Sequence, residues 1–329
     1  MRFLWMALAV ALAFAFPAQA EDFYKGKTVS VVVGFSAGGG FDINARLLAR
    51  YLGRYIPGTP DVVVVNLPGA GSETAVVRLD ADMAKDGTVI DTFNFGLIND
   101  SLLQPQKSRV DFRNYAWIGS ISEDLTVCYI FRADGPKTLA DMKSGHYFFG
   151  LTGTGTSEDI NTKILKRIFG IDVGQVAGYP GSADIRVAIE RGELDGDCGA
   201  WSSIPEEWTT SAKFHPVSRS GQAVEGLPPS VPYSVDLAPG DEAKQVMRVL
   251  LADSDLGRPF IVSRAVPADR VRILRDAFTA AVKDPDFIAE AKKLRLPVSP
   301  RTGEEAAKVI DAIYATPPDI VAAARKVVQ

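Results

Sequence analysis

A glycine-rich turn near the start of the chain is the stretch best suited to hold a ligand. The β-branched run 29–33 is typical of a buried parallel strand, and it opens into Gly34-Phe35-Ser36-Ala37-Gly38-Gly39-Gly40-Phe41-Asp42. Glycines let the backbone turn sharply and expose its N–H groups, and Asp42 can cap a helix over 43–54. Because the first N–H groups of a helix lack partners, this turn predicts an anion site. Its candidate ligand-binding residues are Ser36, Ala37, Gly38, Gly39, Gly40 and Asp42.

A second turn of the same kind lies near the middle of the chain. The predicted strand 147–151 runs into a glycine and hydroxyl cluster at 150–157, and an amphipathic helix follows. Two such helix starts closing on one ligand would supply neutral donors and favour negative charge. Each turn alone could equally be a plain strand-to-helix connection. The candidates here are Thr152, Gly153, Thr154, Gly155, Thr156, Ser157 and Asp159, with Asn94 after the third strand.

Strand-like and helix-like segments alternate along the chain, which predicts an α/β fold with mostly parallel sheets. The predicted strands are 29–33, 62–66, 89–93, 126–131, 147–151, 175–178, 196–201 and 260–263. The predicted helices are 43–54, 73–83, 138–143, 159–169, 182–191, 241–251, 268–282, 286–293 and 303–315. About 310 residues after export favour two domains, and the chain is expected to cross between them near 111–120 and 227–239.

The first residues predict export. Arg2 precedes an apolar run over 3–16 that is too short to span a membrane, and Ala18-Gln19-Ala20 has the small-x-small pattern of a signal peptidase site. We expect a signal peptide over 1–20, cleavage after Ala20 and release into the periplasm. No lipid-accepting cysteine follows the signal, and no later segment reaches the roughly 18 apolar residues that a transmembrane helix needs.

Charge and composition exclude several other classes. The formal net charge of −4 becomes −5 when Arg2 leaves with the signal, which argues against nucleic acid or an anionic membrane surface as partner. We expect no cofactor, because the spacing of Gly34 to Gly40 is not the G-x-G-x-x-G of a dinucleotide site, and no metal, because two histidines and two cysteines lie far apart along the chain. Cys128 and Cys198 lie in apolar, strand-like runs, so we expect two buried thiols, with a disulfide as the alternative.

An ordered set of motifs resembles the Bug-type (TctC-like) substrate-binding proteins of tripartite tricarboxylate transporters. The set begins with the first glycine turn and continues, in order, through the whole mature chain. Its members are 35–42, Asn66-Leu67-Pro68-Gly69-Ala70-Gly71, Lys85-Asp86-Gly87-Thr88, Lys137-Thr138-Leu139-Ala140-Asp141, 150–157, Tyr179-Pro180-Gly181-Ser182-Ala183, Gly192-Glu193-Leu194-Asp195, and 265–310 with Pro267, Asp284-Pro285 and Thr302-Gly303-Glu304-Glu305.

The resemblance implies a monomeric, two-lobed periplasmic protein of the "Venus flytrap" type, similar to type II periplasmic binding proteins. Lobe 1 would comprise 21–119 and 226–329, and lobe 2 would comprise 120–225. In that family a small carboxylate is held by the two glycine loops in the interlobe cleft, partly through ordered water, and is delivered to integral-membrane permease subunits. The two loops are the ones that residue chemistry selects.

One departure from the family pattern concerns the end of the second loop, where a histidine is common and this chain has Glu158-Asp159. Asp159 could simply start a helix, or the acids could meet an amino group on the ligand. The sequence does not name the ligand. Phe35, Phe41 and Phe95 could shape the cleft or belong to the core.

Two other functions stay open. Gly34-Phe35-Ser36-Ala37-Gly38 matches the nucleophile elbow of serine hydrolases, in which Ser36 would be the nucleophile, but only His146 and His215 could act as base. The expectation is nevertheless a protein without enzymatic activity. A ligand-binding module of a sensor system would share the fold and the cleft.

Overall fold

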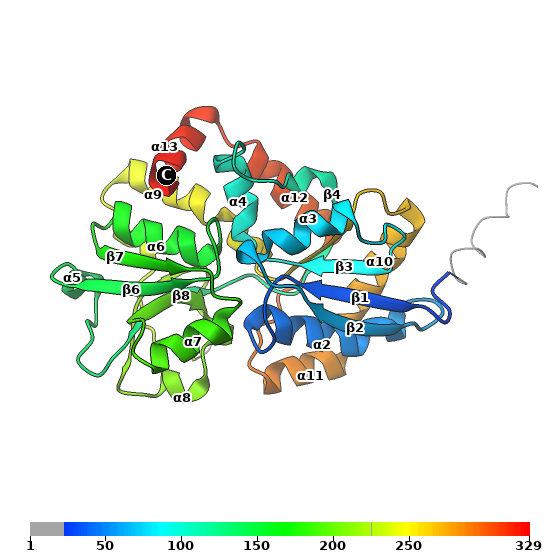
Figure 1. The fold of residues 1–329 in the computed structure, drawn as a ribbon, viewed down its shortest axis with the longest axis horizontal. Coiled ribbons are helices and arrows are strands. Elements are labelled where there is room, and N and C mark those ends of the chain that lie inside the picture. Colours follow the sequence, from blue (N-terminus) through cyan, green and yellow to red (C-terminus); the bar gives the residue numbers. More distant parts are fainter. Residues whose placement is uncertain (1–22, 225) are drawn as a thin grey trace, which may run out of the picture.

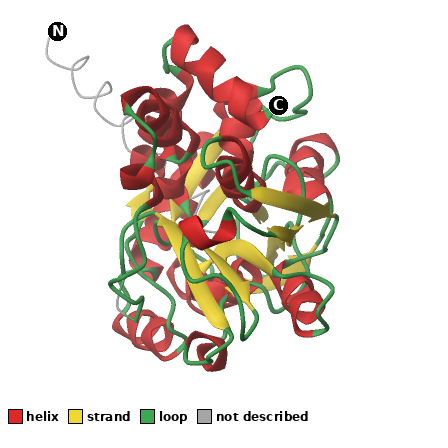
Figure 2. Ribbon diagram, turned by 90° about the vertical axis from the view of Figure 1, so that its left-hand side faces the viewer, coloured by secondary structure: helices red, strands yellow, loops and turns green. Residues whose placement is uncertain are grey.

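Two mixed β-sheets, each covered by helices, form the two lobes of the protein (Figure 1). The structure is a computed structural model that describes residues 23–224 and 226–329. The predicted signal peptide, 1–20, lies outside these residues. In the view turned by 90°, helices surround the strands of both lobes (Figure 2).

The first lobe contains a six-stranded sheet in the order β11-β4-β10-β3-β1-β2. Strand β1 pairs in parallel with β2 and β3, whereas β10 is antiparallel to β3 and β4. Its strands are β1 Thr28–Val33, β2 Asp61–Asn66, β3 Val89–Thr92, β4 Tyr115–Ser120, β10 Pro259–Ser263 and β11 Arg301–Thr302.

The second lobe contains a five-stranded sheet in the order β7-β6-β8-β5-β9. Strand β6 is parallel to β7 and β8, whereas β5 is antiparallel to β8 and β9. Its strands are β5 Thr126–Phe131, β6 His146–Leu151, β7 Asp172–Ala177, β8 Gly196–Ala200 and β9 Phe214–Ser220. The prediction of mostly parallel sheets is therefore wrong. Parallel pairs arise where a helix connects two strands, but β4, β5, β9 and β10 enter or leave a sheet where the chain passes between the lobes.

Helices cover both faces of each sheet. In the first lobe α2, α10 and α11 pack on one face, and α3, α4 and α12 pack on the other. In the second lobe α5 and α6 cover one face, and α7 and α8 cover the other. The helices are α2 Gly40–Tyr55, α3 Glu73–Ala81, α4 Gly96–Leu103, α5 Leu139–Met142, α6 Ser157–Arg167, α7 Ser182–Glu190, α8 Glu206–Thr209, α9 Asp241–Leu250, α10 Ala268–Ala281, α11 Pro285–Lys293, α12 Gly303–Tyr314 and α13 Pro318–Val328. Short 3₁₀ helices are η1 Ala70–Ser72, η2 Phe112–Asn114, η3 Trp201–Ser203, η4 Ser234–Leu237 and η5 Ala252–Leu256.

The C-terminal helix α13 joins elements of the two lobes. It packs against α9, against α4 and against α6, with Val321, Ala324 and Val328 in the shared apolar cluster. Figure 1 shows α13 and α9 above the second sheet. The division of the chain at 119/120 and 225/226 stays a proposal, and part of the C-terminal segment lies beside the second lobe.

The two cysteines form a disulfide, so the expectation of two free buried thiols is wrong. Cys128 of β5 lies directly opposite Cys198 of β8 in the antiparallel register, which places their side chains on the same face of the sheet. Each residue is almost fully buried. This alternative was open in the sequence, but the register that decides it is a tertiary property.

Every predicted strand and helix is present, with boundaries that shift by a few residues. Strands β4, β9 and β11 and helices α4, α8 and α13 are additional. Among the residues that the structure describes, no helix combines the length and the apolar character that crossing a bilayer would require.

Candidate functional site

A cleft of about 410 Å³, including space open to solvent, lies where the two glycine turns approach each other. Two connections between the lobes also reach it, through Asp124 after β4 and Arg258 before β10. The first turn contributes Gly39 and Gly40, and the second contributes Thr152 and Ser157. The full lining is Phe35, Gly39, Gly40, Phe41, Phe95, Asp124, Thr152, Ser157, Glu158, Ser182, Ala200, Ser203 and Arg258.

The first turn presents the start of α2 to the cleft. Gly39 is the N-cap in an extended conformation, with φ of −86°, and Gly40 is the first helical residue. Asp42 therefore does not cap the helix from outside, as predicted, but lies in its first turn. The first N–H groups of α2 lack intrahelical partners, so this end of the helix can donate to an anion in the cleft.

Asp42 holds the first turn together rather than lining the cleft. It is 2% exposed, and its carboxylate accepts the N–H of Gly38 at 2.9 Å, Arg46 Nε at 2.9 Å and Asn66 Nδ2 at 2.9 Å. Burial would raise the pKa of Asp42, but the hydrogen bonds from Arg46, Gly38 and Asn66 outweigh it and hold the pKa below its usual value. Asp42 is thus a charged structural residue.

The second turn repeats this arrangement. Gly155 donates its N–H to Asp159 Oδ2 at 2.8 Å, and Lys163 Nζ pairs with the same oxygen at 2.7 Å. Gln175 donates to Asp159 Oδ1 at 2.8 Å. Gly155 has a φ of +78° and Gly38 has a φ of +83°, a left-handed conformation that favours glycine at both positions.

The carboxylate of Asp159 therefore has its hydrogen-bond partners within the protein, and Asp159 is not part of the cleft lining. The structure places it as a residue of the helix start, paired with a cation one turn later. Of the two adjacent acids, the one that reaches the cleft is Glu158, which was not among the predicted ligand-binding residues.

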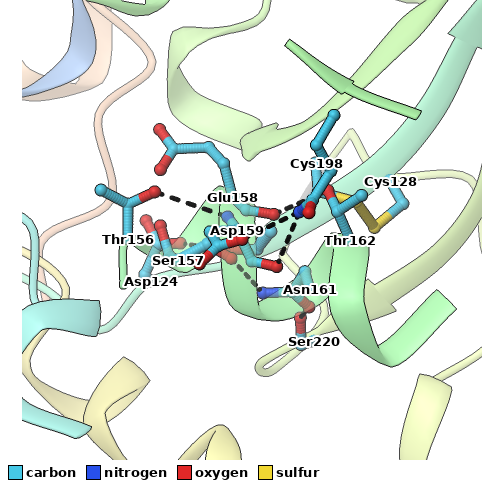
Figure 3. The surroundings of a disulfide bond; sticks show 12 residues. Asp124, Cys128, Thr156, Ser157, Glu158, Asp159, Asn161, Thr162, Cys198 and Ser220 are labelled. Carbon is cyan, nitrogen blue, oxygen red and sulfur yellow. Dashed lines mark hydrogen bonds between the residues drawn. A yellow bond between two sulfur atoms is a disulfide. The ribbon is translucent and has the colours of Figure 1, made fainter. Parts of the chain in front are cut away.

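The start of α6 differs from that of α2 because the N–H groups of Ser157 and Asp159 already have partners within the protein; Figure 3 shows the bond from Asp159 to Thr156. Ser157 donates its N–H to Asn94 Oδ1 at 2.9 Å, and Asp159 donates to Thr156 Oγ1 at 3.4 Å. Asn94 also donates to Ser157 Oγ at 3.2 Å and to Glu158 Oε2 at 3.1 Å. Asn94 therefore links the third strand to the second turn and is not itself in the lining. The expected symmetry of donors does not exist.

The remaining residues of the second turn form a contact between the lobes. A side chain at Gly153 would lie 2.5 Å from the backbone nitrogen of Gly71, and one at Gly71 would lie 2.3 Å from Thr156 Cγ2. Thr154 is exposed. Of the second turn, only Thr152 and Ser157 reach the cleft.

The first turn also makes direct contact with the second lobe. Ser36 Oγ donates to Asp184 Oδ2 at 2.6 Å, and the N–H of Ser36 donates to the carbonyl of Pro180 at 3.0 Å. Arg186 Nη2 donates to the carbonyl of Gly38 at 3.4 Å. Ser36 and Gly38 therefore connect the lobes at the edge of the cleft, and Ala37 beside them is exposed.

A buried cation in the lining was not predicted. Arg258 is 2% exposed and donates from Nη1 to Asp124 Oδ1 at 2.8 Å and from Nη2 to Ser202 Oγ at 3.1 Å. Its guanidinium lies 4.7 Å from the centre of the Phe41 ring. A side chain at Gly40 would meet Arg258 Nη2 at 3.4 Å, so the cation lies directly beside the start of α2.

Two further polar groups face the cleft from the second lobe. Thr152 is 4% exposed, and its hydroxyl oxygen has no hydrogen-bond partner among the described residues. Glu158 is 7% exposed, and burial raises the pKa of its carboxyl. The site thus combines a helix start and a guanidinium on one side with an unpartnered hydroxyl and an acid whose pKa is raised by burial on the other.

The geometry gives Ser36 no basic partner of the hydrolase type. Its hydroxyl hydrogen-bonds to Asp184, whereas His146 pairs with Asp172 at 2.8 Å at the opposite end of β6. His215 lies on β9, opposite Ile130 of β5. Neither histidine is in the lining of the cleft.

Comparison with known proteins identifies relatives along almost the whole chain. No family model matches the sequence. A UPF0065 protein of the TAR-I ttuE-ttuC' intergenic region of Agrobacterium vitis is 24% identical over 315 residues, which cover 89% of each chain.

Solved structures share the fold at low sequence identity. The periplasmic binding protein BugD is similar with a TM-score of 0.71 and 19% identity, covering 93% of this chain and 96% of its own. MatC of Rhodopseudomonas palustris, solved with bound malate, has a TM-score of 0.72 and 20% identity, covering 92% and 99%. A protein of the same organism solved with adipate has a TM-score of 0.71 and 16% identity, covering 91% and 97%. These comparisons confirm the expected resemblance, and the chain has the two-lobed fold of the Bug-type periplasmic binding proteins.

Proposed function

We propose that this protein captures a small carboxylate-bearing solute in the cleft between its lobes. The observation that carries the proposal is the position of Arg258, whose buried guanidinium lies beside the open start of α2 at Gly40. A helix start and a cation together favour an anion, and burial strengthens both interactions. Thr152 supplies an unpartnered hydroxyl to the same space.

The proteins that share the fold support a carboxylate as the ligand class. MatC was solved with malate and the second Rhodopseudomonas palustris protein with adipate, and both ligands are carboxylates. We further propose that the protein works in the periplasm, after signal-peptide cleavage following Ala20. There it would deliver its ligand to the permease subunits of a tripartite tricarboxylate transporter. It acts as a binding protein without turnover.

A thermal-shift screen of the mature chain tests the proposal. Mono-, di- and tricarboxylates, aromatic acids and amino acids are compared, because a ligand at 100 times its Kd adds about 2.7 kcal/mol to stability. The expected result is a carboxylate that raises the melting temperature, with a shift that grows with the logarithm of its concentration above Kd. A screen in which no carboxylate does so would contradict the proposal.

Delivery needs a separate experiment. Uptake of labelled ligand by vesicles that contain the permease should require the mature protein. N-terminal sequencing of the exported protein should give Glu21 as its first residue. Binding without any effect on uptake would favour the sensor module over the transporter.

A further inference from the structure

A second cavity adjoins the cleft and shares two of its walls. It has about 210 Å³ of empty space, including space open to solvent, and Phe95 and Ser157 line both cavities. Beyond them the wall is formed by the polar side chains of Thr126, Asn161 and Ser220 and by residues around the end of α9. A ligand whose carboxylate lies beside Gly40 could therefore extend past Phe95 into this space.

The second cavity contains a buried acid without a complete set of partners. Asp253 is 2% exposed, and its Oδ2 atom has no hydrogen-bond partner among the described residues. A buried polar atom without a partner costs free energy, so such atoms are rare unless a ligand or water satisfies them. Asp253 thus gives the lining of this cavity an acceptor atom that the described residues leave unsatisfied.

The charges around the two cavities determine what kind of atom that is. Asp124, Glu158 and Asp253 are carboxyl groups in the linings, and Arg258 is the one guanidinium or amine group there. Arg258 is already paired with Asp124. Among residues 23–224 and 226–329, neither Glu158 nor Asp253 forms an ion pair, and the charged groups that act on Asp253 are the acids Asp124 and Asp255.

We propose that the second cavity is a subsite for the far end of an elongated carboxylate ligand, and that this end is an amino group that donates to Asp253. The carboxylate end rests on the proposed function. An ammonium group would balance an acidic lining and form a charge-assisted hydrogen bond, whereas a second carboxylate would add a negative charge without a free cation nearby. The chemical class is therefore an ω-amino carboxylate.

Calorimetry with matched ligand series tests the subsite. The probes are linear ω-amino carboxylates of four to seven carbons, with dicarboxylates and simple fatty acids of the same lengths. At one chain length the amino carboxylate should bind at least tenfold more tightly than its two counterparts. Burial raises the pKa of Asp253 well above its ordinary value, so binding of an ammonium should also release protons, measured in buffers of different ionisation enthalpy.

Variants of the second cavity separate binding from folding. Asp253→Asn keeps the shape but cannot carry a charge, and it should lose the tenfold preference and the proton release while still binding the fatty acid. Asp91→Asn is the matched control, because Asp91 is also buried with unpartnered oxygens but lies on β3 outside both linings, and it should change neither. Ser254→Leu adds bulk to the cavity wall and should exclude the longer ligands alone.

The outcomes distinguish the subsite from the proposed function. A preference for dicarboxylates, or an unchanged preference in Asp253→Asn, would overturn the subsite while leaving carboxylate capture intact. Binding only of carboxylates outside this series would overturn the subsite in the same way. Failure of every carboxylate in the wider thermal-shift screen would overturn the proposed function itself.

Discussion

Arg258 and Asp124 form a buried ion pair that joins the two connections between the lobes. Nη1 of Arg258 lies 2.8 Å from Oδ1 of Asp124, and the two side chains are 2% and 3% exposed. The N–H of Arg258 also donates to Ser120 Oγ at 3.2 Å, at the end of β4. Because the same pair lines the cleft, a bound anion would act directly on the segments about which the lobes can move.

Replacing Arg258 should show its contribution to ligand binding separately from its contribution to stability. Arg258→Met leaves the buried carboxylate of Asp124 without its cation, which should lower the free energy of unfolding by about 3 to 5 kcal/mol. Arg258→Met/Asp124→Asn removes both charges and should recover most of that stability, as measured by urea unfolding. Ligand affinity should stay at least tenfold weaker than in the wild type. Wild-type affinity in the folded double variant would show that Arg258 does not contact the ligand.

The hydrogen bond between Ser36 and Asp184 should favour the closed arrangement of the lobes. Ser36→Ala and Asp184→Ala, which remove the donor and the acceptor, should each weaken binding by about 0.5 to 1.5 kcal/mol, the usual contribution of one hydrogen bond. The double variant should be no weaker than either single variant, because both remove the same bond. Small-angle scattering should show a more open average shape in all three. Additive losses of affinity would mean that the two residues act independently.

The disulfide should stabilise the second lobe without taking part in binding. Cys128 and Cys198 are separated by 70 residues, and closing a loop of that length can contribute up to about 4 kcal/mol. Cys128→Ser/Cys198→Ser should therefore unfold at lower denaturant concentration, by about 2 to 4 kcal/mol. Below the unfolding transition its ligand affinity should match the wild type. A loss of affinity in the folded double variant would assign the disulfide a role in positioning α6.

Asp91 should make stability fall as the pH rises. Burial raises the pKa of Asp91 well above its ordinary value of 3.8, so above pH 4 there is a range in which the unfolded chain has ionised this group and the folded chain keeps it protonated. Each pH unit in that range then costs about 1.4 kcal/mol until the folded carboxyl ionises too. Asp91→Asn should match the wild type near pH 4 and exceed its stability by about 1 to 4 kcal/mol at pH 7. Parallel pH profiles of the two proteins would contradict this.

Local patterns predicted most elements of the fold, and tertiary contacts explain the exceptions. The run 29–33 and the glycines after it predicted β1, the turn and α2 correctly. Strand β9 was missed because Pro216 interrupts it, and the chain accommodates that proline at a bulge beside Tyr129. Helix α4 was missed because its sequence has neither a capping side chain nor a strong apolar stripe.

The site was less predictable than the fold. The glycine turns predict Gly40 and Thr152 as site residues. Arg258 could not be predicted in this way, because its position in the site depends on its contact with Asp124, which lies 134 residues earlier in the chain. Asp159 was a reasonable candidate from its position, but only the structure shows that Lys163 and Gly155 already occupy its carboxylate. Which of two adjacent acids faces a cleft depends on the rotation of α6, and sequence spacing does not fix that rotation.

The central claim is that a carboxylate binds at the start of α2. Gly40 allows a direct test, because a side chain there would lie 3.3 Å from Ser203 Cβ and 3.4 Å from Arg258 Nη2 and so fill the anion position. Neither Gly39 nor Gly40 has a positive φ angle, so Gly40→Val should fold normally. Gly38→Ala is the control. An alanine at a φ of +83° is strained by about 1 to 2 kcal/mol, but its Cβ would have no other atom within 4 Å and so would not fill the anion position.

Calorimetry with the tightest carboxylate from the thermal-shift screen provides that test. The wild type and Gly38→Ala should bind with similar affinity, and Gly40→Val should show no heat of binding while its circular dichroism spectrum remains that of the wild type. Equal, tight binding by Gly40→Val and the wild type would show that the ligand binds elsewhere and would contradict the account.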